Sequence, residues 1–514
     1  MRRRRSHVAA LAVWAAAALA FWGQTALGQN YGEDCEMTDK GVIECTRTRR
    51  IPGSGAGVEA EISVGDGSTT TEYGRGMLMT FRTANCADNP TCRTSVESEL
   101  TAMGCEGFTY YPSIQAMGAV CYSPAGSTLQ AKRNFMSALL NLRATASPFS
   151  SASLDSVVSI DPGRDNDPTW SNAGWNRGSW WGRNRRTRTP RTRPPRSGGN
   201  NGPAAPAPSP TPLLEPPSPF VYNWGNDRSN QIVGMDQNRL QCKSGGTDVD
   251  IFILDTGCRP DHDEFMGRAT TESVTMDNGS KPYGSGRDGH GHGTHCAGTA
   301  AGINVGVARD ATVRCVKVLS DSGSGQLSHV VAGLNYVGRW KQANPNRMVV
   351  VSLSLGAGFT QTINNAVDTL TRLGIPAVVA AGNSNVDASQ TSPASSVGAI
   401  TVGASGKTDQ KESFSNWGQV VDIYAPGGGI YSATPDSRSS YTYMSGTSMA
   451  TPMVAGGVAC VLAGAPGRSC TNAALIAKLS NPRVVIEQGG ALQKRARPDR
   501  PLFYLPPDAN VQCP

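Results

Sequence analysis

Four short apolar runs in the second half of the chain restrict most strongly what it can fold into. They are Val249–Leu254, Val313–Leu319, Met348–Leu353 and Ala377–Ala381, and segments of helical period, such as Leu327–Trp340 and Ile363–Leu373, alternate with them. Short apolar strands that alternate with helices are typical of a parallel sheet that is covered on both faces. We therefore predict an α/β domain with a doubly wound, mainly parallel sheet over residues 220–514. In such sheets, functional residues lie in loops at the carboxyl ends of strands.

An earlier part of the chain, residues 29–162, predicts a second and smaller domain. Strand-like runs occur at Met77–Phe81, Phe108–Tyr111, Gln115–Tyr122 and Ser156–Ile160, and helical stretches occur at Thr94–Met103 and Leu129–Leu142. Their order is β-α-β-β-α-β, the split βαβ arrangement of an α+β domain. The stretch contains no histidine and no carboxylate pair that stands out, so we expect no active site in it.

Residues 163–219 separate the two domains as a linker. They hold 12 of the 33 prolines, and such a stretch sustains neither a helix nor a sheet ladder, so we predict a semi-extended, solvated segment. Its first half mixes tryptophan with arginine. That mixture could stack on nucleic acid bases or carbohydrate, but it is more often exposed chain or a cleavage site.

The first 28 residues are predicted to be a signal peptide. Arg2–Arg5 are followed by the apolar run Val8–Trp22 and by the small residues Ala26-Leu27-Gly28. The run is too short for a membrane span, which needs about 20 residues, and no later stretch is long enough either. An uncleaved anchor is the alternative. We expect a secreted protein without a membrane span.

The cysteines and the charge agree with secretion and exclude one class of partner. The 13 cysteines fit an oxidising compartment: the six before the linker suggest three disulfides, and the seven after it leave one thiol over. The net charge is +7, but Arg2–Arg5 carry four of these charges and residues 163–219 carry an excess of six, so the rest of the chain is slightly acidic. We therefore expect no nucleic-acid partner.

Three polar clusters in the second domain carry the chemistry. They are Asp255-Thr256-Gly257, the stretch 288–298 with His290, His292 and His295, and the stretch 445–452 with Ser448 and Pro452. Peptide hydrolysis by a serine needs a hydroxyl, an imidazole that takes its proton and a buried carboxylate that fixes the tautomer of the imidazole. Glycines around each cluster let backbone approach a substrate closely. Pro452 can be accepted in the first turn of the helix that Ser448 opens.

These residues resemble the subtilisin-like serine proteases, and within them the proteinase K branch. The resemblance rests on Asp255-Thr256-Gly257, on the stretches 292–298 and 446–452, and on the chain order Asp, His, Ser. It implies a secreted serine endopeptidase that is made as a zymogen and hydrolyses proteins and peptides. Asp255, His292 and Ser448 would be the triad, and neither His290 nor His295 would be the general base. Asn383 and the backbone N–H of Ser448 would hold the oxyanion.

The same resemblance implies the substrate-binding residues. Gly323-Ser324-Gly325 and Ser354-Leu355-Gly356 resemble the two edges between which a substrate lies as an added strand. Ala380, Ala381 and Gly382 resemble the wall of the pocket for P1, the residue before the scissile bond. They are small and uncharged, so we expect broad specificity with apolar or aromatic P1 residues.

The resemblance also gives a use to residues 29–162 and implies a cofactor. The first domain resembles a propeptide that helps folding and inhibits the enzyme, although its six cysteines and the long linker depart from the family pattern. A separate disulfide-rich binding module is the alternative. Asp422, with the backbone carbonyls of Val397 and Ala399, matches a structural calcium site. A solvated or helix-capping carboxylate is the alternative for Asp422.

Cys296 is the expected free thiol. It lies four residues after His292, so one helical turn places it beneath the imidazole. The other six cysteines of the second domain can then pair in 15 ways, and the sequence does not choose among them.

Each cluster has an alternative function. His290, His292 and His295 could ligate zinc, but no second cluster supplies the remaining geometry. Asp255 and Asp321 could form an aspartic protease pair, but Ser448 would then have no role. Ser448 does not lie in a Gly-x-Ser-x-Gly elbow, and the order of the triad differs from that of α/β-hydrolases. A catalytically silent binding protein is the rival from another class.

Overall fold

The structure is a computed structural model that describes residues 35–37, 43–45, 74–81, 86–122, 149–160, 223–236, 242–276, 279–464, 470–487 and 499–506. The predicted signal peptide (1–28), the predicted helix at 129–142 and the predicted linker (163–219) lie outside these residues. The chain forms two compact units, Met1–Gly163 with Asn223–Pro514 and Arg164–Tyr222, and only the first contains described residues. Within the described ranges, every helix is too short or too polar to cross a membrane.

A nine-stranded sheet is the main feature of residues 223–506. Its strand order is β20-β21-β17-β16-β14-β12-β8-β10-β9, and every neighbouring pair is parallel except β20 and β21. The strands are β8 (Val249–Asp255), β9 (Ala269–Ser273), β10 (Thr312–Lys317), β12 (Met348–Leu353), β14 (Ala377–Ala380), β16 (Ala399–Ser405), β17 (Ile423–Pro426), β20 (Ser480–Glu487) and β21 (Asp499–Phe503). The predicted mainly parallel α/β fold is confirmed.

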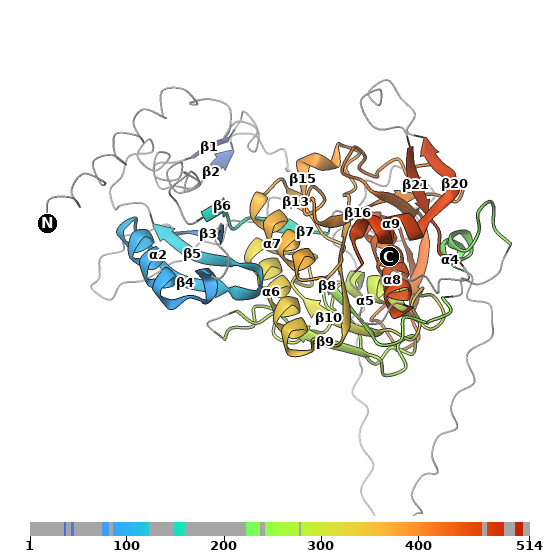
Figure 1. Cartoon of the computed structure of the whole chain (residues 1–514), viewed down its shortest axis with the longest axis horizontal. Helices are drawn as coiled ribbons and strands as arrows, with labels where there is room; N and C mark the ends of the chain where they lie inside the picture. The colour runs from blue at the N-terminus through green and yellow to red at the C-terminus, as the bar shows by residue number, and fades with distance from the viewer. Residues whose placement is uncertain are drawn as a thin grey trace, which may run out of the picture. The chain divides into compact units, whose positions relative to one another are not determined.

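Helices cover both faces of this sheet (Figure 1). They are α5 (His292–Ala301), α8 (Thr447–Ala463) and α9 (Asn472–Leu479) on one face, and α6 (Leu327–Ala343) and α7 (Gln361–Arg372) on the other. Side chains alternate along β8: Ile251 and Ile253 pack with α5 and α8, whereas Phe252 and Leu254 pack with α6 and α7. Both faces of the strand are therefore apolar, which explains the unbroken apolar run in the sequence.

Shorter elements complete this part of the structure. They are α4 (Trp224–Ser229), β11 (Ser324–Gln326), β13 (Ala357–Gly358), η3 (Ala388–Gln390), β15 (Thr391–Ser392), β18 (Ile430–Ala433) and β19 (Tyr441–Met444). The antiparallel pairs are β13 with β15 and β18 with β19. Far toward the N-terminus, β1 (Cys35–Met37) pairs with β2 (Ile43–Cys45).

The N-terminal part forms a four-stranded antiparallel sheet of order β4-β5-β3-β6. Its elements are β3 (Gly74–Phe81), η1 (Cys86–Asp88), α2 (Pro90–Ala102), β4 (Cys105–Tyr111), η2 (Pro112–Ile114), β5 (Ala116–Tyr122) and β6 (Phe149–Leu154). The prediction that Ser156–Ile160 is the last strand of this sheet is wrong. The serine-rich β6 takes that place, and β7 (Val157–Ser159) pairs with β11 instead.

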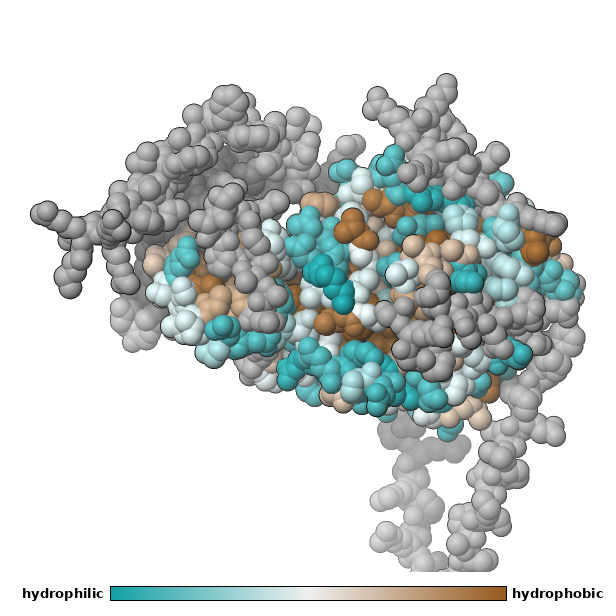
Figure 2. Space-filling view, viewed as in Figure 1, coloured by the Kyte–Doolittle hydropathy of each residue, from teal (hydrophilic) through white to brown (hydrophobic). Residues whose placement is uncertain are grey.

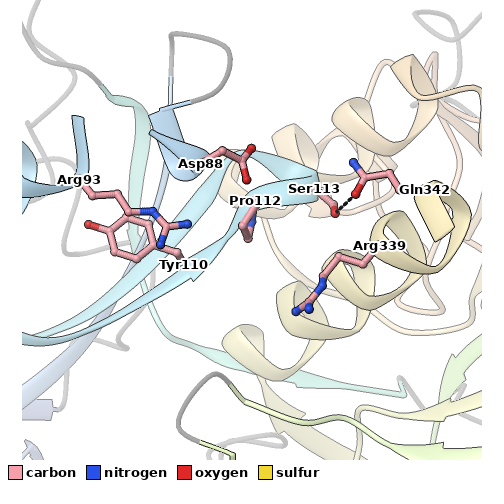
Figure 3. Close-up of a pocket in the computed structure, with 7 residues that line it drawn as sticks. All are labelled: Asp88, Arg93, Tyr110, Pro112, Ser113, Arg339 and Gln342. Atoms are coloured by element: carbon pink, nitrogen blue, oxygen red, sulfur yellow. Dashed lines mark hydrogen bonds between the residues drawn. The ribbon is translucent and has the colours of Figure 1, made fainter. Parts of the chain in front are cut away.

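The N-terminal sheet contacts α6 and α7 through buried apolar side chains, such as Leu78 and Ile114, and through small polar groups. The backbone N–H of Ser113 donates to Asn335 Oδ1 (3.0 Å), and Asn365 Nδ2 donates to Thr80 Oγ1 (2.8 Å). Figure 3 shows a polar pocket beside this contact, between η2 and α6, where Ser113 Oγ donates to Gln342 Oε1 (3.3 Å). None of the predicted catalytic residues lines this pocket.

Disulfides join cysteines within each half of the described structure. The bonds are Cys86–Cys92 and Cys105–Cys121 in the N-terminal part, and Cys242–Cys460 and Cys258–Cys315 in the part with the large sheet. Cys470 is also disulfide-bonded. Among the described cysteines, Cys296 is the free thiol, and it is buried as predicted.

Hydrophilic and near-neutral residues make up most of the coloured surface in Figure 2, and hydrophobic residues form scattered patches on it. Large apolar side chains that are exposed, such as Val233, Met266 and Phe359, lie far apart in the chain. Single exposed apolar residues of this kind are normal on a folded protein and need no partner.

Candidate active site

The carboxylate and the imidazole of the predicted triad meet at the carboxyl edge of the sheet. Asp255 is the last residue of β8, and His292 is the first residue of α5. His292 Nδ1 lies 2.8 Å from Asp255 Oδ1 and 3.0 Å from Oδ2. Asp255 is fully buried, and His292 is 7% exposed. Because a carboxylate only accepts, Nδ1 carries the shared proton, and Nε2 is left as the nitrogen that can take another.

Two effects of opposite sign act on the pKa of His292. Burial lowers this pKa, but the charge of Asp255 and its hydrogen bond outweigh burial, so the pKa lies well above the ordinary value. Cys296 Sγ lies 3.8 Å from His292 Nδ1, one helical turn along α5. Burial raises the pKa of this thiol. The sulfur therefore stays protonated at neutral pH, and the charge beside the imidazole comes from Asp255.

The other two histidines of the cluster have different surroundings. His295 Nε2 lies 3.0 Å from a backbone carbonyl oxygen, and burial lowers the pKa of His295 to about 3, so it stays neutral. Burial also lowers the pKa of His290, whose ring centre lies 6.3 Å from that of His292. Among the described residues, the cluster of three His, Cys, Asp or Glu side chains that could hold a metal ion is Asp255 with His292 and Cys296, not the three histidines of the zinc alternative.

Asp255 and Asp321 do not form the pair of an aspartic protease. Asp321 Oδ1 accepts from Lys317 Nζ (2.7 Å) and from the N–H of Gly289 (3.1 Å). Burial raises the pKa of Asp321, but the bond to Lys317 outweighs burial and the pKa is lowered. In an aspartic protease the two carboxyl groups share one proton, whereas here each carboxylate has its own cationic or imidazole partner.

Ser448 lies in the first turn of α8. Gly446 is the N-cap residue, with φ 156°, and Ser448 is the second helical residue. The Ser448 hydroxyl donates to the carbonyl oxygen of Ser354 (3.2 Å), and within the described part of the chain no hydrogen bond joins it to His292. Catalytic hydrogen bonds are often long before substrate binds, so this geometry is compatible with a nucleophile at rest.

Pro452 lies inside α8 as its sixth residue, so the prediction that it lies in the first turn is wrong. In a regular helix the N–H of this residue would donate to the carbonyl oxygen of Ser448, but proline has no N–H. The freed oxygen accepts from Ser354 Oγ (2.9 Å) and from Cys296 Sγ (3.4 Å). The proline therefore lets two other segments hold the backbone of Ser448.

The amide of Asn383 lies beside Ser448. Asn383 Oδ1 accepts from the N–H (2.7 Å) and from the hydroxyl (2.9 Å) of Thr447, which leaves Nδ2 as the donor. A Cβ built on Gly446 would lie 3.5 Å from Asn383 Nδ2 and 3.5 Å from Ser448 N. The two nitrogen atoms therefore lie on the same side of Gly446, which is compatible with two donors that face one oxyanion.

Asn416 holds the loop that carries Asn383, although the sequence pattern does not single it out. Ala380 ends β14, and Ala381 and Gly382 lead from it to Asn383. Asn416 Nδ2 donates to Ala381 O (2.7 Å), and its Oδ1 accepts from the N–H groups of residues 384 (3.1 Å) and 386 (3.0 Å). Asn416 is buried, so the predicted P1 wall and the Asn383 amide are fixed by one side chain.

The two predicted substrate edges lie on either side of β7. They are Gly323-Ser324-Gly325, of which the last two belong to β11, and Ser354-Leu355-Gly356, which follows β12. Ser324 is opposite Ser159 in an antiparallel pair. Ser159 and Gly356 exchange both backbone hydrogen bonds (3.1 and 3.0 Å), and the N–H of Ile160 donates to Gly323 O (3.0 Å). A segment of the N-terminal part thus lies between the two edges as a strand.

Asp422 lies directly before β17, and its carboxylate is largely buried. Asp422 Oδ2 accepts from the N–H of Thr401 (2.8 Å), and among the described residues no hydrogen bond uses Oδ1. Burial raises the pKa of Asp422, and the Thr401 bond and the charge of Arg500 do not fully offset it. A nearby cation would stabilise the charged form of a buried carboxyl group whose pKa is raised in this way. Val397 precedes β16 and Ala399 begins it, and β16 is parallel to β17, so these residues lie toward the same end of the sheet as Asp422. Their backbone carbonyls are oxygen ligands of the kind that suits a hard cation.

The fold and these groups together define a class of protein. A buried carboxylate bonded to an imidazole, a serine at the start of a helix and an amide beside that serine, all at one edge of a parallel sheet, are the parts of an α/β serine hydrolase. Residues 246–484 match the model of the Subtilase family, so this part of the chain is similar to the members of that family.

Individual relatives agree with the family. The chain is 46% identical over 228 residues to the alkaline serine protease ver112 of Corniculantispora psalliotae, covering 44% of this chain and 57% of that protein. It is 43% identical over 261 residues to the cuticle-degrading protease of Metarhizium anisopliae, covering 50% and 64%. A solved cold-adapted subtilisin-like serine proteinase is 36% identical with a TM-score of 0.47, covering 55% of this chain and 97% of that one. The match thus spans 57% and 64% of the length of the two named curated relatives, less than two thirds of each.

Proposed function

We propose that this chain is the precursor of a secreted serine endopeptidase in which Ser448 is the nucleophile, His292 the general base and Asp255 the residue that orients His292. The observation that carries the proposal is the 2.8 Å bond from buried Asp255 to His292 Nδ1, at the same sheet edge as the first turn of α8. The match of residues 246–484 to the Subtilase family supports the same roles.

In the proposed reaction, Ser448 Oγ attacks the carbonyl carbon of a peptide bond while His292 Nε2 takes the Oγ proton. The C–N bond then breaks as that proton passes to the leaving amine, and water repeats the sequence to release the acid product. Asn383 Nδ2 and the N–H of Ser448 donate to the oxyanion in both halves. Asp255 stabilises the imidazolium that forms, and the raised pKa of His292 expresses this stabilisation.

Protein and peptide substrates are proposed to bind as an extended strand between β11 and the segment 354–356. The position of β7 supports this, because β7 is bonded to both edges through backbone groups that any sequence offers. Ala380, Ala381 and Gly382 provide no charge for a basic or acidic side chain. We therefore expect broad specificity with apolar or aromatic P1 residues, and a cleavage profile dominated by dibasic pairs would contradict this expectation.

Residues 29–162 are proposed to be an inhibitory propeptide that follows a signal peptide (1–28) and precedes a linker (163–219) and the catalytic domain (220–514). Two contacts support inhibition: β7 lies where a substrate strand would lie, and Asp155 Oδ1 accepts from the N–H of Ser328 (2.8 Å) in the first turn of α6. A separate binding module, the alternative, gives no reason for a strand between the two edges.

A structural Ca²⁺ is proposed at Asp422, with the backbone carbonyls of Val397 and Ala399 as further ligands. When bound, the ion supplies positive charge to a buried carboxyl group and no step of hydrolysis. It would bind only the folded loop and therefore stabilise the native state. The raised pKa of Asp422 supports the assignment, because it reflects a carboxyl group with too little positive charge around it.

An organofluorophosphate probe tests the proposed function. The probe should label the wild-type protein at Ser448 and leave Ser448→Ala unlabelled. In a host without other proteases, Ser448→Ala should also leave the chain uncut if the precursor processes itself. A folded wild-type protein, freed of its N-terminal part, that does not react would contradict the proposal and favour a catalytically silent binding protein.

A further inference from the structure

Asp288 is a buried carboxylate that the proposed reaction does not use. It lies in the loop before α5 and is 8% exposed. Asp288 Oδ1 accepts from Thr256 Oγ1 (2.9 Å) and from the N–H groups of His290 (2.9 Å) and Gly291 (2.8 Å). Asp288 Oδ2 accepts from the N–H (2.8 Å) and from the hydroxyl (2.6 Å) of Thr294. Five donors therefore converge on one side chain.

These donors come from the two segments that carry the acid and the base. Thr256 follows Asp255 directly, and the other donors flank His292 in the chain. Thr256 Oγ1 also accepts from the N–H of Gly293 (2.9 Å). The backbone on both sides of the imidazole is thus bonded to one unit, the Asp288 carboxylate with the Thr256 hydroxyl.

We propose that Asp288 is a positioning residue, which fixes Asp255 and His292 relative to each other by joining the turn after β8 to the first turn of α5. The inference rests on the proposed function, because it requires His292 to act as the general base. Helix α5 also needs the Asp288 carboxylate as an acceptor at its N-terminus. Gly291, the N-cap residue, has no side chain to satisfy the first N–H groups, and Asp288 accepts the N–H of Thr294 in its place.

The five donors require a group that only accepts hydrogen bonds. An asparagine at position 288 has one oxygen and one NH₂ group, so in either orientation its NH₂ faces N–H or O–H donors. Asp288→Asn therefore leaves buried donors unpaired, and the two segments should move apart. A displacement near 1 Å of a reacting group costs about 10²-fold in rate.

The experiment compares variants on both sides of the contact. Asp288→Asn and Thr256→Val break it, whereas Thr256→Ser keeps the hydroxyl. Thr471→Ala is the matched control, because Thr471 Oγ1 accepts from the N–H of Ala474 (3.2 Å) at the start of α9, a helix that carries no predicted catalytic residue. For each protein we would measure kcat and KM per reactive active site, the melting temperature and the proton NMR signal of His292 Nδ1–H.

We expect kcat to fall about 10²-fold in Asp288→Asn and less in Thr256→Val, with KM unchanged, because the base is misplaced and the substrate edges are not. The double variant should lose much less than the product of the two single effects, since both residues belong to one network. Thr256→Ser should restore kcat. The Nδ1–H signal should shift or broaden in Asp288→Asn and stay unchanged in Thr471→Ala, which should lower only the melting temperature.

Two failures can be told apart. A wild-type protein that reacts with the probe, together with an Asp288→Asn variant that keeps full kcat and an unchanged Nδ1–H signal, overturns the positioning role alone. An unreactive wild-type protein overturns the proposed function and the inference with it. Equal losses in kcat from Asp288→Asn and from the control Thr471→Ala would show that Asp288 acts only as a helix cap, and this result would also overturn the inference.

Discussion

Gly446→Ala tests the proposed oxyanion hole through one backbone position. Gly446 has φ 156° and ψ 161°, a conformation that is essentially reserved for glycine, and placing alanine there costs about 1–3 kcal/mol. Backbone rotation between Gly446 and Thr447 would relieve this strain. It would also move the N–H of Thr447, which donates to Asn383 Oδ1 (2.7 Å) and so holds the Asn383 amide. The new methyl group would lie 3.5 Å from both Asn383 Nδ2 and Ser448 N, an ordinary van der Waals contact, so the backbone strain and not a clash causes the effect. The substitution should therefore disturb the two donors that bind the oxyanion.

The size of the effect follows from these contacts. Loss of one oxyanion donor costs about 10²–10³-fold in kcat, a magnitude known for a subtilisin, and Gly446→Ala should fall in this range with little change in KM. The strain should lower the melting temperature by about 2–4 °C for each kcal/mol. The assay is hydrolysis of a chromogenic peptide with an aromatic P1 residue, with active sites counted by probe titration.

Gly267→Ala is the matched control for this experiment. Gly267 has φ 80°, and a Cβ built on it meets nothing within 4 Å. Its substitution should cost stability through the same kind of backbone strain and leave kcat unchanged. A Gly446→Ala protein with a lowered melting temperature and wild-type kcat would refute the reasoning, because the strain would then be present without any effect on the donors.

Three further predictions concern the base, the thiol and the ion. A general base works only when neutral, so kcat/KM should rise with pH through the pKa of His292, which Asp255 holds above the ordinary histidine value. Asp255→Asn should lower that pKa, move the rising limb of the pH profile to lower pH and cut kcat about 10⁴-fold; an unmoved limb would contradict this assignment. Hg²⁺ should inhibit without unfolding, because Cys296 Sγ lies 3.8 Å from His292 Nδ1, and full mercury sensitivity in Cys296→Ala would disprove this route. Removal of Ca²⁺ should lower the melting temperature more than the initial rate. An ion at 100 times its Kd stabilises the native state by about 2.7 kcal/mol, and removal loses this stabilisation. Asp422→Asn should abolish most of that shift, and an unchanged shift would exclude Asp422 as a ligand.

The elements that could be predicted from the sequence are those whose signal is local. The strand expected at Val249–Leu254 is β8 (Val249–Asp255), and the helix expected at Leu327–Trp340 is α6 (Leu327–Ala343). A buried strand of a parallel sheet is apolar on both faces, and a helix on a sheet is apolar at every third or fourth residue. Both patterns can be read within a few residues of sequence.

The pairing of β7 could not be predicted in the same way. Two successive valines mark residues 157–158 as a strand, but the partner of a strand is set by tertiary structure. The strand β6, which takes the expected place in the N-terminal sheet, is half serine and has only weak apolar alternation. The sequence therefore predicted the presence of a strand and assigned it to the wrong sheet.

The residues of the candidate site also fall into two groups, those that short sequence motifs identify and those that only the structure identifies. Asp255, His292 and Ser448 stand in short clusters of glycine and polar residues, and such clusters can be recognised. Asn416 bonds backbone groups of the loop that follows β14, and Asp288 accepts from backbone N–H groups of its own loop and of α5 and from the hydroxyl of Thr256. An aspartate in a polar loop has the same sequence context whether it accepts five buried donors or faces water. Only the structure distinguishes these two cases.

If β7 inhibits as proposed, a further consequence follows, because β7 belongs to the same chain as the substrate cleft, which is the space between β11 and the segment 354–356. While the chain between β7 and α4 is intact, a substrate competes with a tethered segment, whose effective concentration is set by the length of the connection and reaches the millimolar range for short flexible ones. After a cut in that connection, the same segment is held only by its own affinity. Dilution of the protein then lowers the occupancy of the cleft. The fraction of protein with an open cleft would thus depend on the volume into which the protein is released, without any change in the shape of the cleft.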